Sequence, residues 1–268
     1  MDRRTTPANQ RVAASHLRAV IERPAYSDGH VATVCRPVLD ILDIPGGRRD
    51  RQILCGTQVT VYEDRDGWSF IQTRQSGYCG YVLSRFLTRD WTPTHRVVSR
   101  STHAYKSADL KSPDQYLLPF LSALAVIETE AGFVRTPLGY VPASHLEPLD
   151  IARPDLVTTA EYLLDTPYLW GGNSTCGIDC SGLVEACFTA ANLPCPGDSD
   201  LQEASIGTAL DTDTTVRRGD LLFWKGHVAI VRDATSIIHA NARDMAVKVE
   251  GLQAAIDRIG PVRTHRRA

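Results

Sequence analysis

The first half of this 268-residue chain is constrained most by a β-strand pattern that occurs twice. In the first copy, alternation of apolar residues over 59–61 and 68–70 is broken at 64–67 by Asp-Arg-Asp-Gly, a hairpin turn signal. The same landmarks return downstream with a shorter hairpin, so we expect two tandem β units of about 60 residues, each with roughly five or six strands. The paired landmarks are Asp66-Gly67-Trp68 with Ala131-Gly132-Phe133, Gly80-Tyr81-Val82 with Gly139-Tyr140-Val141, and Leu87 with Leu146.

The pattern changes after about residue 158, where helical spacing replaces strand alternation. Thr158 or Thr159 is placed to cap a first helix, with Glu161 in its first turn. A second helix begins at Cys180, and Pro194 stops it. The order of this region is therefore helices first and strands later. The expected elements are helices over 158–164 and 180–192 and strands over 221–224, 228–231 and 237–239.

Composition excludes several classes of function. The chain is 43% hydrophobic and 22% charged, with a net charge of −2 and both signs interspersed, so it offers no basic face for nucleic acid. The longest apolar stretch, 117–127, is interrupted by Pro119 and Ser122 and is too short to span a membrane. The charged N-terminus lacks the apolar run of a cleaved signal, and the cysteines number seven, an odd count. We therefore expect reduced thiols and a cytoplasmic setting.

Cys180 is the candidate nucleophile. It follows a Gly-rich loop and opens a helix, where the helix dipole and unpaired N–H groups favour a thiolate. It stands between Asp179 and Ser181 rather than in the apolar stripe, whereas Cys187 is explained as a core residue. A zinc site is the alternative for the four cysteines of this region, but their spacing contains no C-x-x-C. We expect no metal and no cofactor.

His227 is the candidate base, because a cysteine nucleophile needs a partner to take its proton and protonate the leaving amine. His239 follows twelve residues later. A hairpin centred near Asp233 would place the two imidazoles opposite each other on one face, at a Cβ separation of about 5 Å. Asn241 lies on the same face as His239 and is the alternative residue for orienting His227.

Five ordered segments lie between about residues 160 and 242: 167–172 (Pro-Tyr-Leu-Trp-Gly-Gly), 177–184 (Gly-Ile-Asp-Cys-Ser-Gly-Leu-Val), 219–223 (Gly-Asp-Leu-Leu-Phe), 226–228 (Gly-His-Val) and 239–240 (His-Ala). In this order they resemble the NlpC-type cell-wall cysteine peptidases. The two β units ahead of them resemble the bacterial SH3-like barrels that precede the catalytic domain in one branch of that family. The resemblance to that branch implies cleavage of γ-D-glutamyl-diamino acid bonds in murein peptides.

The resemblance implies a role for each matching residue. Cys180, His227 and His239 match the nucleophile, the base and the residue that orients the base, and Tyr168 matches a tyrosine that stabilises the oxyanion. Relatives often carry arginine where Gly197 stands. The positions that match substrate contacts are Asp179 and Ser181 at the substrate's free amino terminus, Trp170, Ser199, and Tyr78 from the first SH3-like unit.

Together these features predict an α+β, papain-like cysteine peptidase domain over 151–268. An N-terminal arm (1–23) and two small SH3-like β-barrels (24–90 and 91–150) precede it. The expected reaction is hydrolysis of the γ-D-glutamyl-diamino acid bond of murein peptides with a free N-terminal L-Ala, in cell-wall recycling. An acyltransferase on the same fold and an inert wall-binding adaptor are the alternatives. The preferred diamino acid, the oligomeric state and a redox role for Cys176 stay open.

Overall fold

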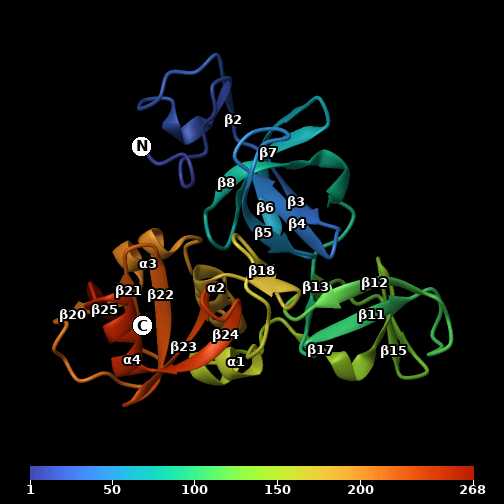
Figure 1. Ribbon diagram of the computed structural model, residues 1–268. Coiled ribbons are helices and arrows are strands. Elements are labelled where there is room, and N and C mark those ends of the chain that lie inside the picture. Colours follow the sequence, from blue (N-terminus) through green and yellow to red (C-terminus); the bar gives the residue numbers. More distant parts are fainter. The chain divides into compact units, whose positions relative to one another are not determined.

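In a computed structural model that describes residues 1–268, the chain forms two compact units, Met1–Leu149 and Asp150–Ala268 (Figure 1). The first unit begins with a parallel pair, β1 (Val12–Ala14) and β2 (Ala25–Ser27). A seven-stranded antiparallel sheet follows, in the order β5-β4-β8-β7-β6-β3-β9. Its strands are β3 (His30–Val34), β4 (Val38–Leu42), β5 (Arg49–Leu54), β6 (Gln58–Arg65), β7 (Trp68–Thr73), β8 (Cys79–Leu83) and β9 (Leu87–Thr88).

The rest of the first unit is divided between two smaller sheets. One has three strands in the order β13-β10-β17, and the other has five in the order β12-β11-β16-β15-β14. The three strands are β10 (His95–Val97), β13 (Ala123–Leu124) and β17 (Leu146–Pro148). The five strands are β11 (Ser101–Tyr105), β12 (Asp114–Pro119), β14 (Glu128–Glu130), β15 (Phe133–Thr136) and β16 (Gly139–Pro142).

Matching hairpins occur at the two predicted repeat positions. β6 and β7 are joined by Asp66 and Gly67, at φ 52° and 80°, and β14 and β15 by Ala131 and Gly132, at φ 49° and 80°. Positive φ at both turn residues gives the twist that suits a two-residue hairpin. In each copy the Gly-Tyr-Val strand, a short 3₁₀ turn and a final strand beginning at Leu87 or Leu146 come next.

Two closed barrels were expected, and neither copy is closed by hydrogen bonds. In the first copy β5 and β9 are the edges of an open order, and β9, only two residues long, pairs with β3 alone. In the second copy the strands are split between two sheets. Each copy nevertheless has its own hydrophobic core. One is built around Val34, Ile41 and Ile71, and the other around Leu118 and Val141.

The second unit combines four helices with a six-stranded sheet in the order β20-β25-β21-β22-β23-β24. Helices α1 and α2 pack against β22 and β23, and α4 packs on Ala229, Val231 and Ile237. The helices are α1 (Leu156–Tyr162), α2 (Cys180–Ala190), α3 (Ser199–Ser205) and α4 (Leu252–Ile259). The sheet strands are β20 (Thr208–Leu210), β21 (Leu221–Trp224), β22 (His227–Asp233), β23 (Ser236–Asn241), β24 (Ala246–Gly251) and β25 (Thr264–Arg267). A small hairpin, β18 (Asn173–Ser174) with β19 (Gly177–Ile178), leads into α2.

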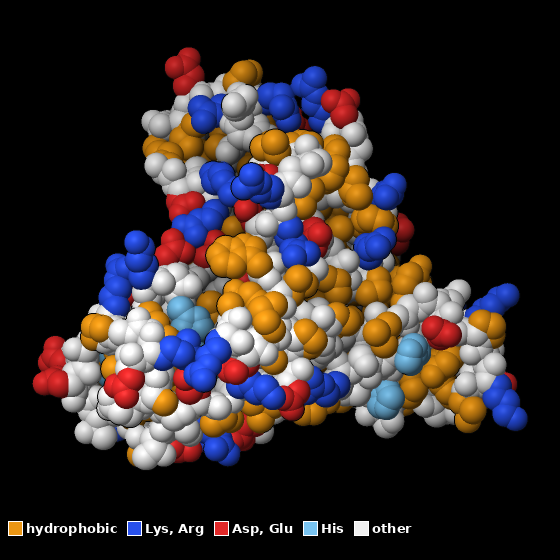
Figure 2. Space-filling view, in the orientation of Figure 1, with side chains coloured by type: hydrophobic (Ala, Val, Ile, Leu, Met, Phe, Trp, Pro, Cys, Tyr) orange, Lys and Arg blue, Asp and Glu red, His pale blue; other side chains and the backbone are white.

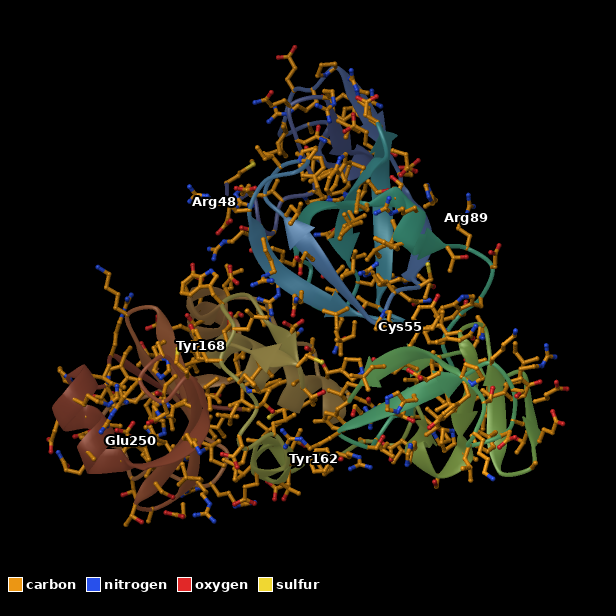
Figure 3. All side chains as sticks on the ribbon, turned by 45° about the vertical axis from the view of Figure 1, so that its right-hand side comes forward. Arg48, Cys55, Arg89, Tyr162, Tyr168 and Glu250 are labelled. Atoms are coloured by element: carbon orange, nitrogen blue, oxygen red, sulfur yellow. The ribbon has the colours of Figure 1, made fainter.

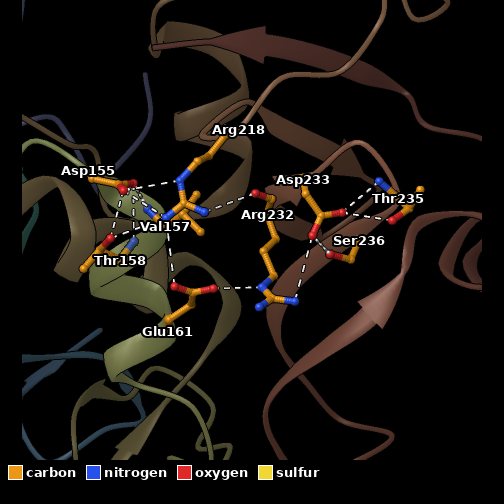
Figure 4. Close-up of polar contacts among 9 residues, drawn as sticks. All are labelled: Asp155, Val157, Thr158, Glu161, Arg218, Arg232, Asp233, Thr235 and Ser236. Carbon is orange, nitrogen blue, oxygen red and sulfur yellow. Dashed lines mark hydrogen bonds and ion pairs between the residues drawn. The ribbon is translucent and has the colours of Figure 1, made fainter.

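Helix α1 starts earlier than the sequence pattern indicated, because Asp155 rather than Thr158 or Thr159 caps it. The Asp155 carboxylate accepts hydrogen bonds from the N–H groups of Val157 (3.0 Å) and Thr158 (3.3 Å) (Figure 4). Arg218 also donates to Asp155 at 2.9 Å. This cap therefore fixes the start of the helix and ties it to the segment that leads into β21.

The turn between β22 and β23 is held by its own side chains. Asp233 accepts hydrogen bonds from the N–H of Thr235 (2.9 Å) and from the hydroxyl of Ser236 (2.7 Å) (Figure 4). Arg232 donates to Glu161 of α1 at 2.8 Å, so the hairpin is anchored to that helix. These bonds set the register of the two strands that carry the candidate histidines.

The length of the helices and the distribution of surface charge can be compared with what the composition predicted. No helix in the structure is long and apolar enough to cross a bilayer. On the face drawn in Figure 2, lysine and arginine side chains are interspersed with aspartate and glutamate.

Candidate active site

Asp179 builds the start of helix α2 around Cys180. Its Oδ1 accepts hydrogen bonds from the N–H of Gly182 (2.7 Å) and the hydroxyl of Ser181 (2.9 Å), and its Oδ2 accepts from the N–H of Gly171 (2.8 Å). A carboxylate has about four lone-pair positions, so one position on Oδ2 is left for another donor. The carboxylate therefore locks the Gly-rich loop to the helix start and keeps Cys180 at its first residue.

The Cys180 thiol is 7% exposed, and its surroundings keep it protonated. Burial raises the pKa of Cys180 to about 12, and the Asp179 carboxylate adds to the rise; hydrogen bonds from the N–H groups of Val228, Ser181 and Cys180 itself oppose it. The expectation that the helix start would yield a resting thiolate is therefore wrong. Desolvation beside a carboxylate outweighs the helix dipole.

His227 and His239 are in direct contact. Nε2 of His227 lies 2.9 Å from Nδ1 of His239, and the ring centroids are 5.1 Å apart. The turn lies beyond the expected centre at Asp233, since β22 and β23 pair Ile230 with Ile238. Continued along the strands, that register places His239 diagonally across from His227 rather than directly opposite. The contact forms because diagonal neighbours on one face remain within reach of an imidazole.

His227 is neutral at physiological pH. Burial lowers its pKa to about 4, helped by the positive fields of His239 and Arg258 and opposed by Glu250. Because Nε2 is occupied by His239, Nδ1 is the nitrogen available to take a proton. The Val228 N–H, one residue after His227, hydrogen-bonds the Cys180 thiol group. The Cys180 thiol therefore lies beside the start of β22, the strand that begins at His227.

Asn241 makes no hydrogen bond to His227. Its side-chain amide donates to Asp244 at 3.1 Å, and its carbonyl oxygen accepts the N–H of Asp244 at 2.9 Å. Both ends of the amide therefore serve the turn between β23 and β24. Of the two candidates for orienting His227, His239 is the one that is hydrogen-bonded to it.

Tyr168 comes from the loop before β18 (Figure 3). Its phenol lies within electrostatic reach of the Cys180 thiol. Its backbone N–H donates to the carbonyl of Met245 at 2.8 Å, which ties this loop to the start of β24. Burial raises the pKa of Tyr168 to about 12, with further contributions from Cys180 and Asp179. The phenol therefore stays protonated and remains a hydrogen-bond donor.

The remaining predicted residues are spread more widely. Trp170 is 71% exposed and stands at the surface of the same loop as Tyr168. Ser199 is the first residue of α3, and this helix is joined to α2 because Gln202 donates to the carbonyl of Ser181 at 3.0 Å. Tyr78 is buried in the core of the seven-stranded sheet of the first unit, with the Arg51 guanidinium 5.3 Å from its ring centroid.

Glu250 is the charged residue of this region that the sequence did not identify. Its Oε2 lies 3.1 Å from Nε2 of His239, as an ion-pair contact, and its Oε1 accepts from Nε of Arg258 at 3.0 Å. Glu250 is the last residue of the alternating segment Ala-Val-Lys-Val-Glu, and this pattern predicts that its side chain faces solvent. No local signal distinguishes it from Lys248, its neighbour two residues earlier.

Comparison with known proteins identifies two segments. Residues 165–257 match the NlpC/P60 family, and residues 41–87 match the bacterial dipeptidyl-peptidase SH3 domain. Dipeptidyl-peptidase 6 of Lysinibacillus sphaericus is 28% identical over 228 residues, covering 75% of this chain and 83% of that protein. The γ-D-glutamyl-L-lysine dipeptidyl-peptidase of Bacillus subtilis is 29% identical over 226 residues, covering 74% of each chain.

A solved structure shares the fold. The crystal structure of an NlpC/P60 family protein from Bacillus cereus superposes with a TM-score of 0.76 at 20% identity, covering 89% of this chain and 99% of that one. The family matches and the buried cysteine at the start of α2 point to the same chemistry. The chain is therefore a cysteine peptidase of the NlpC/P60 type, with an NlpC/P60 domain behind a bacterial SH3 domain.

Proposed function

We propose that this peptidase hydrolyses the γ-D-glutamyl bond to a diamino acid in murein peptides that carry a free N-terminal L-Ala. The observation that supports this best is geometric: Cys180 opens α2, the N–H of Val228 hydrogen-bonds its thiol group, and the preceding residue His227 lies 2.9 Å from His239. Relatives that span about three quarters of this chain are named as γ-D-glutamyl-L-lysine dipeptidyl-peptidases, which favours this linkage over others.

The proposed chemistry begins with a neutral pair. As Sγ of Cys180 attacks the carbonyl carbon, its proton passes to Nδ1 of His227, which later delivers it to the departing amine. The C–N bond breaks, a thioester remains on Cys180, and water then releases the acid. The Tyr168 hydroxyl and the N–H of Cys180 are donors for the oxyanion, and the neutral state of the phenol suits that task. His239 orients His227 through its Nδ1.

The substrate's amino terminus is assigned to the end of the site near Asp179. A carboxylate with one unused lone-pair position suits an α-ammonium group, and Ser181 lies beside it. Trp170 supplies an exposed aromatic surface, and Ser199 a hydroxyl at the start of α3. Tyr78 is not assigned to the substrate, because its side chain is buried in the hydrophobic core of the first unit.

The proposal includes the domain arrangement. Residues 1–23 form an arm, 24–90 and 91–150 the two SH3-like modules, and 151–268 a papain-like catalytic domain in which the nucleophile opens a helix and the base begins a strand. All seven cysteines are free, which suits a reducing compartment such as the cytoplasm and a role in recycling wall peptides.

The test is incubation with L-Ala-γ-D-Glu-L-Lys and with L-Ala-γ-D-Glu-diaminopimelate, followed by mass spectrometry of the products. The matched control is the same tripeptide with D-Glu joined through its α-carboxyl. We expect L-Ala-D-Glu and the free diamino acid from the γ-linked peptides alone. Equal cleavage of the α-linked control, or none of either, would contradict the proposed specificity.

A further inference from the structure

Three side chains form a diagonal row across adjacent strands of the second unit. His227 stands on β22, His239 on β23 and Glu250 on β24. Because β23 and β24 pair Ile237 with Glu250, and His239 is two residues from Ile237, Glu250 and His239 lie on the same face. The contacts in this row are 2.9 Å from His227 to His239 and 3.1 Å from His239 to Glu250.

The row determines which nitrogens carry protons. Nε2 of His239 has no aligned hydrogen-bond partner, and its nearest polar contact is the Glu250 carboxylate, at an ion-pair distance of 3.1 Å. A carboxylate only accepts, so Nε2 of His239 carries the hydrogen that faces it. Nδ1 of His239 is then an acceptor, and it requires a hydrogen on Nε2 of His227. In neutral His227 this leaves Nδ1 with a free lone pair. That is the nitrogen required to take the proton of the Cys180 thiol.

Glu250 is itself held in place and held charged. Both Nε and Nη2 of Arg258 donate to its two oxygens, and Nη1 of Arg243 lies 3.3 Å from Oε1. The Arg258 bonds lower the pKa of Glu250, supported by the fields of His239 and Arg243. The carboxylate side chain is 11% exposed and the His239 side chain 0%. Water therefore has little room to replace this contact.

We infer that Glu250 is a positioning residue of the peptidase: through His239 it fixes the tautomer of His227 that can accept the thiol proton. The inference rests on the proposed function, since it assigns His227 as the base. The Glu250 carboxylate contacts His239, Arg258 and Arg243, and it acts on the thiol only through the two imidazoles.

The test is Glu250→Gln. With the amide oxygen in the Oε1 position, it still accepts from Nε of Arg258, and the NH2 faces His239 and opposes only Nη2 of Arg258. The reverse arrangement would oppose the NH2 to two donors, Nε of Arg258 and Nη1 of Arg243, so the first is expected. Nε2 of His239 would then accept, and the hydrogens would shift so that Nδ1 of His227 is protonated. We expect kcat to fall at least about tenfold with KM unchanged, because proton transfer by a positioned base contributes about 10²–10⁴-fold. Imidazole ¹⁵N NMR of the free enzyme should show both tautomers changed.

Glu203→Gln is the matched control. Glu203 is 13% exposed, pairs with Arg263 at 3.2 Å and lies in the same unit, but it contacts no histidine. It should keep both the wild-type kcat and the tautomers. Glu250→Asp keeps the charge and should retain the wild-type tautomers even where the shorter side chain slows turnover.

Removal of the Glu250 charge also has a predicted sign in the pH profile. His227 is influenced by His239 and Arg258, which lower its pKa, and by Glu250, which raises it. Burial lowers the pKa of His239, Arg258 lowers it further, and Glu250 and Asp244 raise it. Loss of the Glu250 charge should therefore move the acid limb of kcat/KM to lower pH.

Three results would overturn the inference: wild-type tautomers in Glu250→Gln, a kcat within about twofold of wild type, or an equal loss in Glu203→Gln. If the wild-type enzyme cleaved no murein peptide, the proposed function would fail. The NMR comparison would still decide the role of Glu250, because it needs no substrate.

Discussion

The Asp179 carboxylate has two effects: it caps α2, and its negative charge raises the pKa of Cys180. The substitution Asp179→Asn separates the two. Asn caps helices about as well as Asp, so its oxygen can keep the Gly182 N–H. Its NH2 end has no lone pair for the N–H of Gly171, which is buried. A buried N–H without an acceptor costs about 1–3 kcal/mol, and we expect the free energy of unfolding to fall by that amount.

The lost charge should act on the thiol in the opposite sense. Asp179 contributes to the raised pKa of Cys180, so the neutral amide should lower that pKa and increase the thiolate fraction at pH 7. Two charges a few ångströms apart near a protein surface interact by about 1–4 kcal/mol. Even the lower end of that range predicts alkylation of Cys180 that is at least about fivefold faster.

The assay is a short iodoacetamide pulse at pH 7 followed by peptide mapping, with the exposed Cys176 as an internal reference. In the wild type we expect Cys176 to be labelled before Cys180. The control is Asp155→Asn at the cap of α1, which should reduce stability without changing the labelling of Cys180. Unchanged labelling of Cys180 in Asp179→Asn, or equal acceleration in the control, would refute the electrostatic argument.

Three further predictions concern turnover. Cys180→Ala should abolish hydrolysis. It should lower the free energy of unfolding, measured by thermal denaturation, by only about 1 kcal/mol, because one small buried group is lost. Residual hydrolysis would contradict the proposed mechanism. The base must be neutral to act, so kcat/KM should hold from pH 7 down to about 5 and fall as the pH drops through about 4; an acid limb between pH 6 and 7 would contradict the lowered pKa of His227. N-acetylation of L-Ala-γ-D-Glu-L-Lys removes a charge that would face Asp179, and kcat/KM measured by mass spectrometry should fall about tenfold; equal rates would show an open cleft.

Local features of this protein could be predicted from the sequence because short-range contacts determine them. The turn at Asp66 and Gly67 follows from residues that tolerate positive φ. The start of α2 at Cys180 follows from a capping Asp179 and apolar residues at helical spacing. The contact between His227 and His239 depends on a single hairpin. It forms although the strand register differs from the predicted one, because diagonal neighbours on one face can also touch.

Burial and long-range strand pairing decided the rest. The sequence places a dipole and N–H groups beside Cys180, but only the tertiary structure shows the desolvation that keeps the thiol protonated. Strand order shows that the first sheet is open, although its turns and alternation suit a barrel. Glu250 gains its position from the pairing of β23 with β24 and from Arg258 on α4. From the sequence alone, a glutamate near the end of a strand is predicted to face solvent, because charged side chains are mostly exposed. Only the tertiary structure shows the partners that bury it.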